Sequence, residues 1–202
     1  MCVCNEIGRR IVVLGHSEGA IIATHLAAHD SRVRGAVLLA GSATPGDELL
    51  LWQARNVLPT LPAPVRGLLR LLRIDPLAKV TKNHTKLRAT TADVARIGGV
   101  RTNVKWFREF MAYDPRIDLS AITVPVLAIT GGKDIQVNPA DLDVMSDLKP
   151  DSLTVERPPL VTHTLREQEG AASVRAYKKG LRKPIDASLT STVVGWILDV
   201  VN

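Results

Sequence analysis

Cysteine is scarce in this chain of 202 residues, and its two cysteines, Cys2 and Cys4, both lie near the beginning. They are too close together for an ordinary disulfide and too few for a structural zinc site, which favours a reducing compartment. Long apolar runs are missing too, because no stretch approaches the ~18 unbroken apolar residues of a membrane span. Residues 1–10 also lack the apolar core of a signal peptide. We therefore expect a cytoplasmic protein without a transmembrane segment.

Acidic residues are few in the middle of the chain. The formal net charge is +6, and residues 55–110 hold twelve Lys and Arg residues against three acids. No zinc-ligand cluster or RNA-binding aromatic motif accompanies this basic segment. We interpret it as a solvated helical surface and expect no nucleic-acid partner.

The content of apolar residues, 46%, is enough for a sizeable core in one domain or in one domain with an insertion. Short apolar runs predict strands at 10–15, 33–43 and 122–134, and a weaker run predicts a fourth at 151–159. The first run has the form of a strand that is buried on both faces.

Helical patterns separate these runs. Residues 18–30 have a helical repeat formed by Ile21, Ile22, His25, Leu26 and His29. A last helix is expected to begin after Asp186 as N-cap. Strands that alternate with helices predict an α/β fold with a mostly parallel sheet of about four strands.

Between the second and third strands lie Leu-rich helical pieces broken by prolines, which are too long for a loop. We expect a helical cap at 47–115, inserted between two core segments at 1–46 and 116–202. Four leucines at 68, 69, 71 and 72 alternate with arginines at 66, 70 and 73. They predict either an amphipathic surface that contacts lipid or acyl chains or a lid helix whose apolar side packs on the core.

The sequence Gly15-His16-Ser17-Glu18-Gly19 matches G-x-S-x-G between an apolar strand and a helix. In this turn the residues two before and two after the serine must be small, which leaves the serine hydroxyl exposed above the sheet. The helix N-terminus brings free N–H groups to the place where an oxyanion would form. Ser17 is therefore a candidate nucleophile.

A serine nucleophile needs a base, and the base needs an acid that holds its tautomer. Asp134 follows the third strand, and His163 follows the fourth strand 29 positions later. An ordinary turn would also explain Asp134. Asp141 and Asp143 compete for the acid role, but they are expected on a helix that directs them away from the strand end.

The other histidines have simpler interpretations. His16 occupies a variable position of the motif, and His84 falls inside the cap. His25 and His29 are four residues apart on one helix face, a spacing that can hold a metal ion, but no acidic third ligand lies nearby in the sequence. We expect neither a metal nor a cofactor.

These residues resemble the α/β-hydrolase superfamily. "GHSEGA" looks like the elbow of its esterase, dienelactone-hydrolase-like and acyl-peptidase-like members, "VPVLAITGGKD" like the strand before its acid, and "VTHTLR" like its histidine loop. The resemblance implies a serine hydrolase in which Ser17 is the nucleophile, Asp134 the acid and His163 the base, acting on a small acyl substrate without a cofactor.

The resemblance also implies a missing part, because family members have about a hundred residues before the elbow. The missing part would include a neighbouring strand, which would leave 10–15 as an apolar edge, and the loop that supplies a second oxyanion donor. Only the Glu18 N–H is then identifiable, and the loss of one donor costs about 2.7–4 kcal/mol in kcat.

Three functions are consistent with the sequence. The first is hydrolysis of a carboxylic ester or related acyl compound through an acyl-enzyme. The second is cleavage of an amide by the same residues. The third is a truncated, non-catalytic remnant or interaction module.

Overall fold

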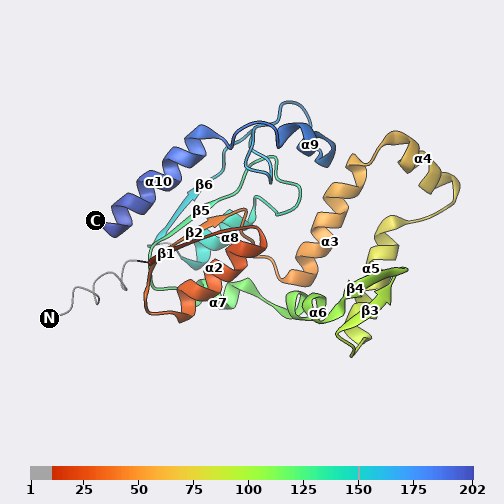
Figure 1. The fold of residues 1–202 in the computed structure, drawn as a ribbon, viewed down its shortest axis with the longest axis horizontal. Coiled ribbons are helices and arrows are strands. Elements are labelled where there is room, and N and C mark those ends of the chain that lie inside the picture. Colours follow the sequence, from red (N-terminus) through yellow and green to blue (C-terminus); the bar gives the residue numbers. More distant parts are fainter. Residues whose placement is uncertain (1–10, 150) are drawn as a thin grey trace.

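The computed structural model describes residues 11–149 and 151–202, which fold around a parallel sheet with strand order β1-β2-β5-β6 (Figure 1). The strands are β1 (Ile11–His16), β2 (Val33–Leu39), β5 (Val126–Ile129) and β6 (Leu153–Glu156). Every neighbouring pair is parallel. The chain thus has the predicted α/β fold with a four-stranded sheet.

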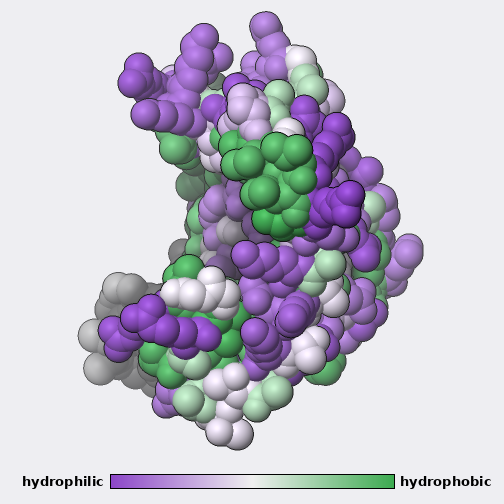
Figure 2. Space-filling model, turned by 90° about the vertical axis from the view of Figure 1, so that its right-hand side faces the viewer, coloured by the Kyte–Doolittle hydropathy of each residue, from purple (hydrophilic) through white to green (hydrophobic). Residues whose placement is uncertain are grey.

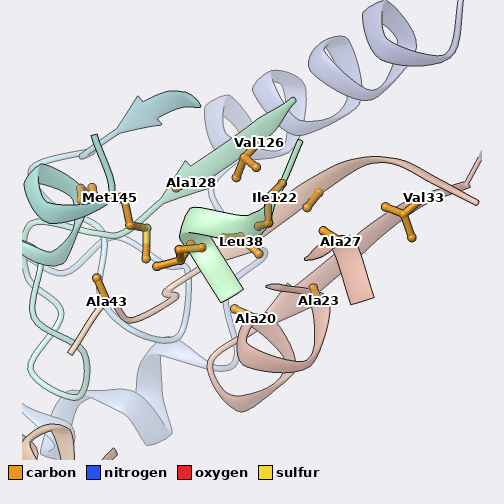
Figure 3. Packing of buried hydrophobic residues seen from close by; sticks show 13 residues of the cluster. Ala20, Ala23, Ala27, Val33, Leu38, Ala43, Ile122, Val126, Ala128 and Met145 are labelled. Atoms are coloured by element: carbon orange, nitrogen blue, oxygen red, sulfur yellow. The ribbon is translucent and has the colours of Figure 1, made fainter. Parts of the chain in front are cut away.

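Helices cover both faces of this sheet. They are α2 (Glu18–His29), α7 (Pro115–Ala121), α8 (Asp141–Leu148) and α10 (Ala187–Val201). Successive residues of β2 alternate between two cores: Leu38 packs with residues of α2, α7 and α8, and Val37 packs with residues of α10 (Figure 3). The α10 N-terminus is the expected one, since the Asp186 carboxylate accepts a hydrogen bond of 2.8 Å from the Leu189 N–H.

Burial along the strands differs from the expectation at β1. Strands β2 and β5 are almost wholly buried, but β1 pairs only with β2 among the described strands, and Ile11 and Leu14 are exposed. The prediction that this run is buried on both faces is therefore wrong, whereas the apolar edge implied by the resemblance is what the described strands form.

Helix α2 packs with small residues rather than with its large apolar ones. Its buried residues are Ala20, Ala23, Thr24 and Ala27, whereas Ile22 and Leu26 are exposed. Small side chains let the helix axis approach the sheet closely (Figure 3). The large apolar residues that form the helical repeat in the sequence therefore lie mainly on the outer side of this helix.

The segment between β2 and α7 contains more than the predicted helices. Its elements are α3 (Gly46–Val57), the 3-10 helix η1 (Leu58–Thr60), α4 (Ala63–Leu71), α5 (Pro76–Ala89), the antiparallel strands β3 (Val94–Ile97) and β4 (Val100–Asn103), and α6 (Val104–Ala112). The β3-β4 hairpin was not predicted. Gly98 and Gly99 form its turn with φ of 59° and 87°, a conformation that favours glycine.

Helix α4 buries none of its residues. Leu68, Leu71 and Leu72 are 55%, 79% and 57% exposed. The view from this end of the molecule shows a compact hydrophobic patch surrounded by hydrophilic side chains (Figure 2). The prediction that this helix packs its apolar side on the core is thus wrong, and contact with lipid or acyl chains stays a prediction.

After β6 the chain forms a long loop with η2 (Val174–Ala176) and α9 (Tyr177–Gly180) before it enters α10. None of the helices formed by the described residues has the length and apolar character needed to cross a membrane.

Candidate functional site

Ser17 occupies the turn between β1 and α2 in a strained backbone conformation. Its φ is 57° and its ψ is −119°, and its N–H donates to the Leu39 carbonyl at 2.9 Å. A residue other than glycine adopts such a conformation only where its surroundings enforce it, and such residues cluster at functional sites. The turn has the geometry that the G-x-S-x-G motif predicts.

The two glycines of this motif are not equally constrained. A Cβ added at Gly15 would lie 1.9 Å from the Gly19 carbonyl oxygen, whereas a Cβ at Gly19 would meet nothing within 4 Å. The expectation that both positions must be small therefore holds in this structure for Gly15 and not for Gly19.

Asp134 lies in the loop after β5, and its side chain is fully buried. Its Oδ1 accepts hydrogen bonds from the N–H groups of Gln136 and Val137, at 2.8 and 2.9 Å. Two backbone donors fix the carboxylate plane and leave Oδ2 to face His163.

His163 lies in the loop after β6, and its Nδ1 is 2.8 Å from Asp134 Oδ2. Because a carboxylate only accepts hydrogen bonds, Nδ1 carries the proton of this pair. Neutral His163 then has its lone pair on Nε2, which is the tautomer that a general base requires. The structure thus joins the predicted acid and base, which lie 29 positions apart in the sequence.

Within the described residues, the Ser17 hydroxyl makes no hydrogen bond with the His163 ring. Such contacts are often long in the absence of substrate and tighten when it binds. The structure therefore places Ser17 and His163 beyond the C-terminal ends of β1 and β6, the two outer strands of the order β1-β2-β5-β6, and their direct contact stays a prediction.

His16 links the elbow to the histidine loop, a role that the sequence analysis missed. Its Nε2 donates to the His163 carbonyl at 2.8 Å, and the two rings have centroids 4.9 Å apart. Burial against these neighbours lowers the pKa of His16, which favours the neutral form that donates from Nε2. No sequence signal identifies this contact, because it joins two residues 147 positions apart.

The competing acids have other partners. Asp141 is buried, and its carboxylate accepts hydrogen bonds from the hydroxyls of Ser42 and Thr44 at 2.6 and 2.7 Å, which fixes the loop after β2. Asp143 forms an ion pair of 2.7 Å with Arg157. Neither is bonded to His163 in the part of the chain that the structure describes.

A pocket of about 150 Å³ opens at Ser17 and Glu18. Most of its remaining lining is contributed by α3, α6 and the loop after Asp134, and includes Leu49, Leu50, Gln53, Trp106, Phe110, Gln136 and Val137. Trp106 Nε1 donates to Glu18 Oε1 at 2.7 Å, which ties α6 to the first residue of α2. The Glu18 N–H is one of the first N–H groups of α2 and has no intrahelical acceptor.

A larger hollow of about 270 Å³ is formed by the histidine loop and the segment that follows it. It is lined mainly by charged and polar residues between Thr162 and Lys183 and includes none of the three candidate residues. His84 lies on α5 and lines neither of these two cavities. The smaller pocket is therefore the one that combines a concave apolar wall with the strained serine.

Solved structures with the same fold support this arrangement of strands and helices. The chain matches VinJ with a TM-score of 0.55 and 16% identity, over 98% of this chain and 68% of that one. It matches a monoacylglycerol lipase of Paleococcus ferrophilus with a TM-score of 0.51 and 16% identity, over 98% and 72%. Est1E from Butyrivibrio proteoclasticus gives a TM-score of 0.51 and 15% identity, over 93% and 60%, so this chain spans less than two thirds of that protein.

No curated protein sequence matches the chain. A family described as serine aminopeptidase, S33, matches residues 3–166, which include the elbow, Asp134 and His163. The match covers most of the sequence and agrees with the parallel sheet and the strand-to-helix turn at Ser17. The chain therefore belongs to this serine aminopeptidase family within the α/β-hydrolase superfamily.

Proposed function

We propose that this protein is a serine hydrolase that cleaves a carboxylic ester through Ser17, His163 and Asp134. The observation that carries the proposal is the buried pair of His163 Nδ1 and Asp134 Oδ2 at 2.8 Å. A carboxylate fixed by two backbone donors, a histidine in the tautomer of a base, and a strained serine after another strand of the same parallel sheet are the parts of an acyl-transfer site.

The reaction proceeds in two halves. Ser17 Oγ attacks the substrate carbonyl while its proton passes to His163 Nε2, and the negative charge develops on the carbonyl oxygen beside the Glu18 N–H. His163 then gives the proton to the leaving alcohol, which leaves an acyl-enzyme. Water, deprotonated by His163, attacks this ester and releases the acid and the free Ser17 hydroxyl. Asp134 keeps the His163 ring oriented and stabilises its cationic form.

The pocket indicates the size and character of the acyl group. Its volume of about 150 Å³ and its wall of Leu49, Leu50 and Phe110 suit a short apolar acyl chain. We propose that the segment 47–115 acts as a cap, because α3 and α6 supply this wall. Contact of the exposed leucines of α4 with lipid or acyl chains is a further part of this proposal.

Labelling with a fluorophosphonate probe tests the nucleophile. The full chain should be labelled, Ser17→Ala should not, and Ser42→Ala should be labelled because Ser42 lines the same pocket without being the nucleophile. Asp134→Asn should slow labelling by about 10⁴-fold through the wrong tautomer of His163. Folded protein that the probe does not label would contradict the proposal and support a non-catalytic role.

The family match makes an amide substrate the alternative. A p-nitrophenyl ester and a p-nitroanilide with the same short acyl group separate the two. Faster turnover of the ester by wild type, abolished in Ser17→Ala, supports the esterase. Preferential turnover of the anilide would assign the protein an amidase activity instead.

A further inference from the structure

A second group of polar side chains lies on the outer side of α2, away from Ser17. His25 Nδ1 is 2.9 Å from Asp118 Oδ2, and His29 Nε2 is 2.8 Å from Asp118 Oδ1. One atom from each of the three residues can be chosen so that all lie within 4.8 Å of one another. Helices α2 and α7 pack side by side here (Figure 1).

No metal is expected from the sequence, because no acidic ligand lies near the two histidines along the chain. The fold supplies one, from 93 and 89 positions away in the sequence. Asp118 is also held in place, because the Tyr113 hydroxyl donates to its Oδ2 at 2.7 Å. The carboxylate is therefore a fixed ligand, and the two imidazoles are adjustable ones.

The three side chains differ in solvent exposure, and this difference suits a site that takes up an ion from solution. The side chains of His25 and His29 are 59% and 54% exposed, whereas that of Asp118 is 9% exposed. An ion can reach the imidazole nitrogens directly, and water can occupy the remaining coordination positions. Both histidines are surface residues, so their replacement should leave the fold intact.

We propose that His25, His29 and Asp118 form a binding site for a divalent transition-metal ion of the zinc class. Two imidazoles and one carboxylate form a ligand set that first-row transition metals bind, with open positions for water. The i, i+4 spacing of the histidines presents both rings on one helix face.

The distances fit this coordination after a small adjustment. Zinc bonds of about 2.0–2.1 Å at tetrahedral angles place two ligand atoms about 3.3 Å apart. Each histidine nitrogen faces a different oxygen of Asp118, Oδ2 for His25 at 2.9 Å and Oδ1 for His29 at 2.8 Å, and both separations are a few tenths of an ångström shorter. An ion bound between the two histidines would therefore meet both oxygens of Asp118, and the two exposed rings would have to rotate outward to admit it.

The site is separate from the proposed catalytic pocket. His25 and His29 lie about 12 and 18 Å along the helix axis from Ser17. A bound ion would connect α2, which carries the elbow at its N-terminus, to α7. The site does not depend on the proposed hydrolase activity, since none of its ligands lines the pocket.

Zinc titration of the full chain tests the proposal. Because thiolates also bind zinc, Cys2 and Cys4 are first replaced by serine. Isothermal calorimetry should then show binding of one zinc ion, and the His25→Gln/His29→Gln double variant should bind at least about tenfold more weakly. His84→Gln, a histidine change on α5, is the matched control and should bind like its parent.

Imidazole NMR signals give a second readout that does not require a stable variant. Excess ZnCl₂ should shift the signals of His25 and His29 and leave that of His84 in place. Equal affinity in the double variant and its parent, or unmoved signals of His25 and His29, would overturn the proposal.

Discussion

Alanine at Gly15 should disrupt the elbow, whereas alanine at Gly19 should be tolerated. The new Cβ at Gly15 would lie 1.9 Å from the Gly19 carbonyl oxygen and 2.2 Å from the carbonyl carbon, both backbone atoms that cannot rotate away. Real Cβ contacts are essentially never shorter than 3.0 Å, so β1 and the first turn of α2 must separate by about 1.1 Å. Gly19 has open space around the position of a Cβ.

The expected losses of stability and of reaction rate follow from this displacement. Overpacking of a closely packed site typically costs about 1–3 kcal/mol of unfolding free energy. A misplacement of about 1 Å at a catalytic group costs on the order of 10²-fold in rate. Gly19→Ala replaces a helical glycine by alanine, the residue with the highest helix propensity. The free energy of unfolding should therefore stay equal or rise by up to about 1 kcal/mol.

Urea unfolding of wild type, Gly15→Ala and Gly19→Ala measures the first effect, and the rate of fluorophosphonate labelling measures the second. The stability measurement does not depend on catalytic activity. If Gly15→Ala is as stable and as reactive as wild type, or if Gly19→Ala is equally damaged, the steric account of the elbow is wrong.

Three further predictions concern contacts around the site and the surface of α4. Trp106→Phe removes the donor to Glu18 Oε1 while keeping an aromatic wall. Because this hydrogen bond is exposed, its loss should slow labelling by roughly tenfold or less. Burial lowers the pKa of His16, so the unfolded chain takes up a proton at this residue at a higher pH than the folded chain does. The free energy of unfolding should therefore fall as the pH drops below about 6.5. This decrease should be smaller in His16→Gln, and equal slopes in a pH series of urea titrations would contradict the reasoning. Replacing Leu68 and Leu71 by serine should weaken sedimentation with phosphatidylglycerol vesicles and change unfolding by less than about 0.5 kcal/mol; unchanged sedimentation would exclude lipid contact through α4.

The sequence predicts the sheet well because β-branched runs ended by glycine are local signals. The positions of β2 and β5 follow from short apolar runs, and that of α10 follows from its helical repeat and the Asp186 cap. Burial is less predictable, because it depends on which elements pack together. Ile22 looks like a core residue in the helical repeat, yet the close approach of α2 to the sheet selects the alanines instead.

The candidate site, too, is only partly predictable from the sequence. Ser17, Asp134 and His163 can be named from the sequence because each follows a strand, and parallel strands end at one edge of a sheet. Their order along the chain adds a constraint that single motifs lack. The His16 contact with the His163 carbonyl and the approach of Asp118 to His25 cannot be found this way, since neither partner is local in sequence.

The edge position of β1 has a consequence for local motion. Of the described strands, only β2 forms a hydrogen-bonded ladder with β1, so the backbone that leads into Ser17 is held from one side. Amide protons of β1 that face away from β2 should exchange with solvent much faster than those in the ladder. The reactivity of Ser17 then depends on how rarely the β1-β2 ladder opens. A molecule that pairs with the side of β1 facing away from β2 would slow this opening and hold Ser17 in its strained conformation for longer.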